Sequence, residues 1–109
     1  MAVGTTKIRA RPKDGATEVM VLVSHPMETG LRVDPQTKEK IPAHFIQKMT
    51  FELNNKVIAT ADLGTGISKD PLISVLVNTK PGDKVKAVWT DNKGASGGAE
   101  TVVGREAGR

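Results

Sequence analysis

Short runs in which apolar and polar side chains alternate dominate this sequence, and no stretch repeats its apolar residues with the period of an amphipathic helix. Residues 7–12 illustrate the pattern, with three basic side chains on one face of a predicted strand and Ile8, Ala10 and Pro12 on the other. Further strands are predicted at residues 17–23, 45–53, 56–61, 72–78, 84–90 and 99–103. The chain is therefore predicted to be all-β.

Turn signals separate these runs. The pair Asn54-Asn55 tolerates the positive φ of a tight hairpin turn, so the strands on either side are expected to be antiparallel neighbours. In residues 45–53 the odd-numbered side chains, from Phe45 to Leu53, are predicted to face the core, and the glycine-rich residues 94–98 are interpreted as flexible. Seven short strands in about 100 residues predict an immunoglobulin-like β-sandwich of about seven antiparallel strands, without the Cys and Trp spacing of antibody domains.

Length and composition exclude several classes of protein. The 109 residues are sufficient for one domain, predicted over residues 1–109, with an ordered core at about 7–103 and flexible termini. The net charge of +4 is spread along the chain, and its three aromatic residues fit a core, so nucleic-acid binding is not predicted. No apolar run has the roughly 20 residues of a membrane span, and no signal segment is recognised, which alone indicates a soluble cytoplasmic protein.

Two surfaces leave alternatives open. Residues 17–23 and 72–77 carry apolar side chains on both faces, which fits either a fully covered strand or a contact with another protein. The basic alternation of Lys7, Arg9 and Arg11 fits either an edge strand protected by charge or a surface complementary to an acidic partner. Neither pair of alternatives is decided by the sequence.

The connection at residues 24–44 is unusually long for a compact domain, and such connections are usually functional. Pro26 and Gly30 specify its shape, since one fixes φ and the other permits a left-handed turn. Residues 31–33 and 39–41 are predicted to pair as a small hairpin around residues 34–38.

Both histidines of the chain lie at the two ends of this connection. His25, His44 and the Met27 thioether are candidate ligands for a soft ion such as copper. The favoured interpretation is structural: each histidine is hydrogen-bonded to backbone or packs in an interface. The three candidate ligands do not complete a coordination sphere. A catalytic pair of either histidine with Ser24 is disfavoured because no orienting acid is recognised. No catalytic, cofactor or metal site is therefore predicted.

Three segments carry a family resemblance: residues 24–32 (SHPMETGLR), 41–46 (IPAHFI) and 89–94 (WTDNKG). In order and spacing they resemble the SoxZ family of the bacterial sulfur-oxidising (Sox) system, and the resemblance covers residues 7–103. It implies a non-catalytic, cofactor-free subunit that pairs with SoxY. The residues expected to contact the partner are His25, Pro26, Met27, His44 and Phe45.

The resemblance also implies how the complex works. In that family a mobile glycine-rich arm of SoxY bears the cysteine to which thiosulfate-derived intermediates are attached, and other Sox enzymes contact the carrier transiently. The absence of cysteine from this chain fits a supporting subunit. The family implies a periplasmic location, reached by export with a SoxY that carries the signal, and this replaces the cytoplasmic expectation.

Two other classes remain open: a periplasmic metal-binding (copper-type) β-sandwich, and a general immunoglobulin-like interaction module. The sequence leaves open which strands contact the partner, how tight the pair is and which sulfur species are favoured, and self-association of the isolated chain is possible. We hypothesise that residues 24–44 guide the mobile arm of the partner, because proline and glycine give them a fixed shape.

Overall fold

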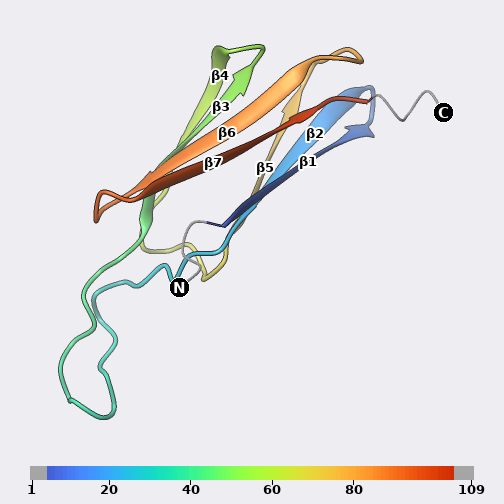
Figure 1. The fold of residues 1–109 in the computed structure, drawn as a ribbon. Coiled ribbons are helices and arrows are strands. Elements are labelled where there is room, and N and C mark those ends of the chain that lie inside the picture. The colour runs from blue at the N-terminus through green and yellow to red at the C-terminus, as the bar shows by residue number, and fades with distance from the viewer. Residues whose placement is uncertain (1–4, 105–109) are drawn as a thin grey trace.

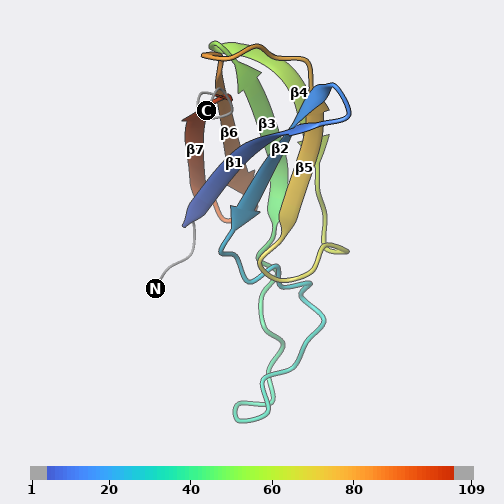
Figure 2. The same ribbon diagram turned by 90° about the vertical axis from the view of Figure 1, so that its right-hand side faces the viewer.

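The computed structural model describes residues 5–104, which form two facing antiparallel sheets (Figures 1 and 2). The strands are β1 (Thr6–Lys13), β2 (Ala16–Val23), β3 (Ile46–Leu53), β4 (Lys56–Asp62), β5 (Leu72–Val77), β6 (Lys84–Asp91) and β7 (Ser96–Val102). The predicted immunoglobulin-like sandwich of seven strands is confirmed. Within residues 5–104 there is no helix that could cross a membrane. The predicted flexible termini fall on residues 1–4 and 105–109, outside this range.

One sheet has the order β1-β2-β5 and the other has the order β4-β3-β6-β7. Tight turns close the β1-β2 and β3-β4 hairpins: Asp14 and Gly15 have φ values of 51° and 83°, and Asn54 and Asn55 have values of 50° and 70°. Two successive positive φ values match the right-handed twist of the paired strands. The asparagine pair therefore acts as predicted, and β3 and β4 are antiparallel neighbours.

The core lies between the sheets and is mainly aliphatic. Alternate residues of β2 are completely buried, as are Met49 of β3 and Ala87 of β6. Trp89 is also buried, with an exposed fraction of 1%. Its indole Nε1–H donates a hydrogen bond of 2.9 Å to the Thr6 hydroxyl, which ties β6 to β1 across the two sheets. The sandwich is thus joined along the side where β1 lies beside β7.

The predicted core face of residues 45–53 is wrong for the residues before Met49. The pairing of β3 with β6 shifts register between Ile46 and Lys48, which reverses the alternation at this point. Ile46 is consequently buried and Gln47 exposed, whereas Met49 and Phe51 face the core as predicted. Phe45 precedes the strand and is half-buried.

The interpretation of residues 94–98 as flexible is also wrong, because β7 begins at Ser96 rather than at residue 99. Both strand glycines allow a close approach of β6. A Cβ atom on Gly97 would lie 2.8 Å from Cζ2 of Trp89, and one on Gly98 would lie 2.7 Å from the Ala87 carbonyl oxygen. These glycines are required by packing rather than by flexibility.

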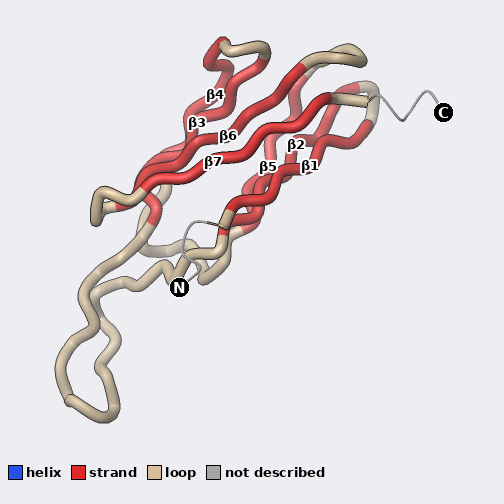
Figure 3. The backbone as a smooth tube through the Cα atoms, viewed as in Figure 1, coloured by secondary structure: helices blue, strands red, loops and turns tan. Residues whose placement is uncertain are grey.

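Residues 24–44, here called the projecting segment, leave the end of the sandwich as a long loop (Figure 3, tan). The predicted small hairpin is confirmed: Val33 forms a bridge with Lys40, and the Ile41 amide donates to the Arg32 carbonyl at 2.8 Å. With this segment, the molecule measures 55 Å along its longest axis and 24 Å across.

Candidate functional site

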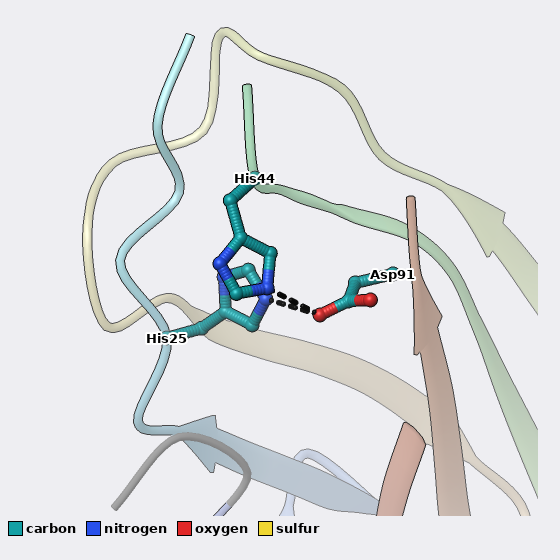
Figure 4. Close-up of side chains that lie close together, drawn as sticks. All are labelled: His25, His44 and Asp91. Carbon is teal, nitrogen blue, oxygen red and sulfur yellow. Dashed lines mark hydrogen bonds and ion pairs between the residues drawn. The ribbon is translucent and has the colours of Figure 1, made fainter. Parts of the chain in front are cut away.

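The two ends of the projecting segment meet at a buried carboxylate (Figure 4). His25 follows β2, His44 precedes β3, and Asp91 is the last residue of β6. Nε2 of His25 lies 3.0 Å from Oδ2 of Asp91, and Nε2 of His44 lies 2.7 Å from the same oxygen. The side chains of His25 and Asp91 are completely buried, whereas that of His44 is 18% exposed. We call these three residues the His-Asp-His cluster.

The proton on the His25 ring is fixed by the backbone. The Met27 amide donates a hydrogen bond of 3.1 Å to Nδ1 of His25, so Nδ1 is an acceptor and Nε2 carries the proton. Met27 reaches this position with a φ of 49°. His25 is therefore a neutral donor to Asp91, and all its ring nitrogens have a partner.

Asp91 accepts hydrogen bonds on both oxygens. Its Oδ1 takes the backbone amides of Lys93 and Ala95, each at 2.9 Å, while Oδ2 takes the two histidines. Burial alone would raise the pKa of Asp91, but the imidazole and amide hydrogen bonds outweigh it and lower the pKa to about 2. The carboxylate is therefore ionised and fully satisfied at neutral pH.

Aromatic packing and a neighbouring carboxylate fix the orientation of His25. Its ring meets that of His44 edge to face with centroids 4.5 Å apart, and that of Trp89 with centroids 5.6 Å apart. The His25 backbone amide donates to Oδ1 of Asp70 at 2.9 Å, and the Asp70 amide donates back to the His25 carbonyl at 2.9 Å. The connection between β4 and β5 thus also holds His25.

Asn92 holds the other end of the projecting segment. Its side-chain oxygen accepts from the Phe45 amide at 2.7 Å, and its side-chain amide donates to the Ala43 carbonyl at 2.9 Å. The Asn92 amide donates to the Phe45 carbonyl at 3.1 Å. The turn after β6 therefore anchors residues 43–45 as well as both histidines.

The soft-ion ligand set of His25, His44 and Met27 finds no support in this geometry. The Met27 sulfur accepts the Ile46 amide at 3.4 Å, and it is Asp91 that joins the histidines, with ligand atoms within 4.8 Å of one another. Two imidazoles and a carboxylate suit zinc or iron by donor type. A metal-binding histidine, however, normally donates its second N–H to an acceptor, whereas Nδ1 of His25 faces the Met27 N–H. The proton arrangement favours a structural clasp.

The same arrangement argues against a catalytic pair of His25 with Ser24. The acid that the sequence did not reveal is present in Asp91, yet Nδ1 of His25 already accepts a backbone amide. That nitrogen has no lone pair left with which to receive a proton from a serine. His25 therefore cannot serve as the general base.

The five residues predicted to contact a partner all lie at the base of the projecting segment. His25 and Met27 are buried within the chain, and Pro26, His44 and Phe45 are half-buried. Their contact with a partner stays a prediction. Asp91 and Asn92 were not recognised as site residues, although they lie in the segment 89–94 that carries the family resemblance, because His44 and Phe45, which they bind, lie 47 residues away.

A hollow of about 590 Å³ lies at the base of the projecting segment, between residues 26–32 and residues 65–69. Arg32 lines it and binds Glu28 through two hydrogen bonds of 3.1 and 2.6 Å. Glu28 also pairs with His44 through backbone hydrogen bonds of 2.7 and 3.0 Å. The base of the projecting segment is thus a braced two-stranded ladder with a hollow on one side.

Comparison with known families gives one match. The family model described as "Sulphur oxidation protein SoxZ" matches residues 6–102, which is nearly the whole chain. No curated protein matches the sequence.

Solved structures with similar folds include superoxide reductases. One, solved in the oxidised state, has 14% sequence identity and a TM-score of 0.68 over 95% of this chain and 90% of its own. The superoxide reductase from Nanoarchaeum equitans has 16% identity and a TM-score of 0.64, covering 94% of each chain. A hypothetical protein from Pyrococcus horikoshii OT3 has 16% identity and a TM-score of 0.65, covering 94% of this chain and 90% of its own. At these identities the likeness establishes the fold alone.

Proposed function

Because this chain belongs to the SoxZ family of sulphur oxidation proteins, we propose that it holds and presents a cysteine-bearing SoxY partner in a sulfur-carrier heterodimer. Family membership gives the chain a role in the Sox sulfur-oxidation system. The match over residues 6–102 carries the proposal, because it spans all seven strands. In this role the chain is non-catalytic and needs no cofactor.

The composition and the site both support a non-catalytic role. None of the 109 residues is cysteine, so a covalent sulfur adduct on a thiol must be carried by the partner. In the His-Asp-His cluster, every polar atom of His25 and Asp91 is engaged in a hydrogen bond. Because these two side chains are fully buried and all their hydrogen-bonding groups are used, they stabilise the fold and have no group left to receive a substrate proton.

We further propose that the projecting segment guides the mobile arm of the partner. Its support is mechanical: the ladder between Glu28 and His44 and the contacts of Asn92 hold its base in one position. Exposed apolar side chains, Leu31 and Val33, lie farther along it. A braced projection with apolar side chains suits transient contact with a flexible chain.

The proposed location is the periplasm, reached together with the partner. Its support is the family, which implies a periplasmic carrier and export of this chain together with a SoxY that carries the signal. Cell fractionation of a strain that expresses both proteins tests it: this chain is expected in the periplasmic fraction when the SoxY-like protein is present. Its recovery in the cytoplasmic fraction alone would contradict this location.

The partner role is tested by size-exclusion chromatography with light scattering, on this chain alone and after co-expression with a SoxY-like protein from the same genome. A one-to-one complex is the expected result. Adding Zn²⁺ or Cu²⁺ to the isolated chain provides the comparison with a metal-binding sandwich. If the folded chain does not bind the SoxY-like protein and instead binds one equivalent of metal, the carrier proposal is wrong and the metal-binding sandwich takes its place.

A further inference from the structure

On the outer face of the β1-β2-β5 sheet, charged and apolar side chains lie at opposite edges. The strand registers align its outward side chains in three rows across the sheet. From β1 to β5, the rows are Lys7-Leu22-Leu72, Arg9-Met20-Ser74 and Arg11-Glu18-Leu76. One edge of this face is therefore basic, and the opposite edge is mainly leucine.

The leucines of this face are exposed to an unusual degree. Leu22, Leu72 and Leu76 have exposed fractions of 42%, 63% and 58%. These values exclude the alternative that both sides of β5 are covered within the chain. A hollow of about 460 Å³ lies on the same face and is lined by both basic and apolar side chains, among them Arg9, Met20 and Leu72. Neighbouring exposed apolar side chains on a sheet mark a contact surface.

The edge formed by β5 lacks the protection that edge strands usually have. No residue from Leu72 to Val77 is charged or proline, whereas β1, at the other edge of the sheet, contains Lys7, Arg9 and Pro12. Natural sheets use such residues to prevent unwanted pairing. An unprotected edge beside exposed leucines is expected where a partner covers both.

In the described part of the chain, the unpaired cations at the β1 edge indicate that the partner carries negative charge there. Glu18 pairs with Arg11 at 3.0 Å and with Lys13 at 3.8 Å. Among residues 5–104, no carboxylate pairs with Lys7 or Arg9. A partner without acidic groups at this position would remove water from these two cations and leave them unpaired. That loss of solvation would lower the affinity of the complex.

A second copy of this chain does not fit face to face. A two-fold axis parallel to the strands would lay the cations of β1 on the leucines of β5 in the other copy. A two-fold axis across the strands would lay cations on cations. Either arrangement buries unpaired or like charges, so the face is suited to a different protein.

We propose that the outer face of the β1-β2-β5 sheet is where this chain binds its protein partner, and that the partner presents an apolar strip flanked on one side by Asp or Glu. The proposal rests on the proposed function for the existence of that partner and adds the surface and its chemistry. The apolar strip lies on Leu22, Leu72 and Leu76, and the acidic groups face Lys7 and Arg9.

The apolar half is tested with the double variant Leu72→Glu/Leu76→Glu. Its control is Val57→Glu on β4, because Val57 is 57% exposed, as Leu76 is at 58%, but lies on the other sheet. Each variant is co-purified with the SoxY-like protein after its fold is checked by circular dichroism. The double variant is expected to weaken the complex at least about 100-fold, and the control less than about threefold.

The outcomes separate the two proposals. If the wild-type chain does not bind, the proposed function and this surface both fall. If the wild-type chain and the double variant bind equally well, the surface is overturned and the proposed function stands. If the isolated chain is a dimer that the double variant makes monomeric, the occupant is a second copy and the inference of a different protein is overturned.

The charged half is tested by stopped-flow association of Lys7→Glu/Arg9→Glu with the SoxY-like protein. Its control is Lys48→Glu, an exposed lysine on β3 in the other sheet. The double variant is expected to associate about 10-fold more slowly at low salt, with the difference shrinking as salt rises. An unchanged association rate at low salt would overturn the acidic flank.

Discussion

At the scale of single residues, the carboxylate of Asp91 holds the site together, because it accepts four hydrogen bonds from three segments of the chain. Asp91→Asn would replace an acceptor with an amide that turns a donor toward one histidine or toward the backbone. We expect the free energy of unfolding in urea to fall by about 2–4 kcal/mol, since buried donors lose their ionic acceptor.

The matched control is Asp62→Asn. Asp62 ends β4 as Asp91 ends β6, but it is exposed. Its replacement is expected to change the unfolding free energy by less than about 0.5 kcal/mol. Equal effects of the two variants would contradict the role given to the His-Asp-His cluster.

The lowered pKa of Asp91 predicts a dependence of stability on acid. Because the pKa falls from 3.8 to about 2 on folding, the stabilisation is present above pH 4 and is lost as the pH falls from about 4 through 2. A shift of this size corresponds to roughly 2 kcal/mol. Unfolding free energies measured between pH 5 and pH 2 should show this loss in the wild type. The loss should be smaller in Asp91→Asn, and equal slopes in both proteins would contradict it.

Only part of this site could be predicted from the sequence. The two histidines were recognised because they flank an unusual connection, but Asp91 contacts them across 66 and 47 residues. No local pattern encodes such a contact, since it depends on how β6 lies against the ends of β2 and β3. The proton on His25 depends further on the backbone of Met27.

At the scale of elements, the pairing of β6 with β7 depends on a glycine. Gly97→Ala would place a Cβ atom 2.8 Å from the Trp89 ring, which is buried and cannot move aside. We expect a loss of about 1–3 kcal/mol in unfolding free energy. Gly66→Ala is the control, because a Cβ there meets no atom within 4 Å. A neutral Gly97→Ala would show that the Trp89 ring is not held in this position.

The strands themselves were predictable because alternation and turn residues are local signals. The asparagine hairpin and the alternation of β6, with Val85, Ala87 and Trp89 buried, are direct products of those signals. The bulge near Gln47 and the strand character of Gly97 were missed for one reason. Both are imposed by pairing with β6, which is remote in sequence from Gln47 and is the hairpin partner of β7, and this pairing overrules the local pattern.

The projecting segment can be tested as an element of its own. Gly30 lies against Ala43, so residues 31–42 can be replaced by Asn-Gly with the backbone ladder between Glu28 and His44 kept, and the exposed Arg32–Glu28 pair is lost. The shortened chain is expected to keep its unfolding free energy within about 1 kcal/mol and its partner, while turnover of the carrier by other Sox enzymes falls. Unchanged turnover would remove the guiding role of the segment.

At the scale of the whole molecule, the two outer faces of the sandwich should respond differently to the partner. Hydrogen exchange of the complex is expected to slow at backbone amides of β2 and β5 and to leave those of β4 unchanged, because the proposed contact lies on the exposed leucines of the first sheet beside Lys7 and Arg9. Protection of β4 instead would place the partner on the other sheet.

Both ends of the projecting segment are hydrogen-bonded to one carboxylate. The contacts at the base of the loop therefore offset the conformational entropy lost on closing it, whatever the sequence of the rest of the loop. For a loop closed in this way, doubling its length adds only about 0.6 kcal/mol of chain entropy. The segment can therefore lengthen, shorten or change sequence almost independently of the sandwich. Related chains could acquire different reach and different cargo handling on the same scaffold, and foreign peptides grafted at residues 34–38 should be displayed without loss of folding.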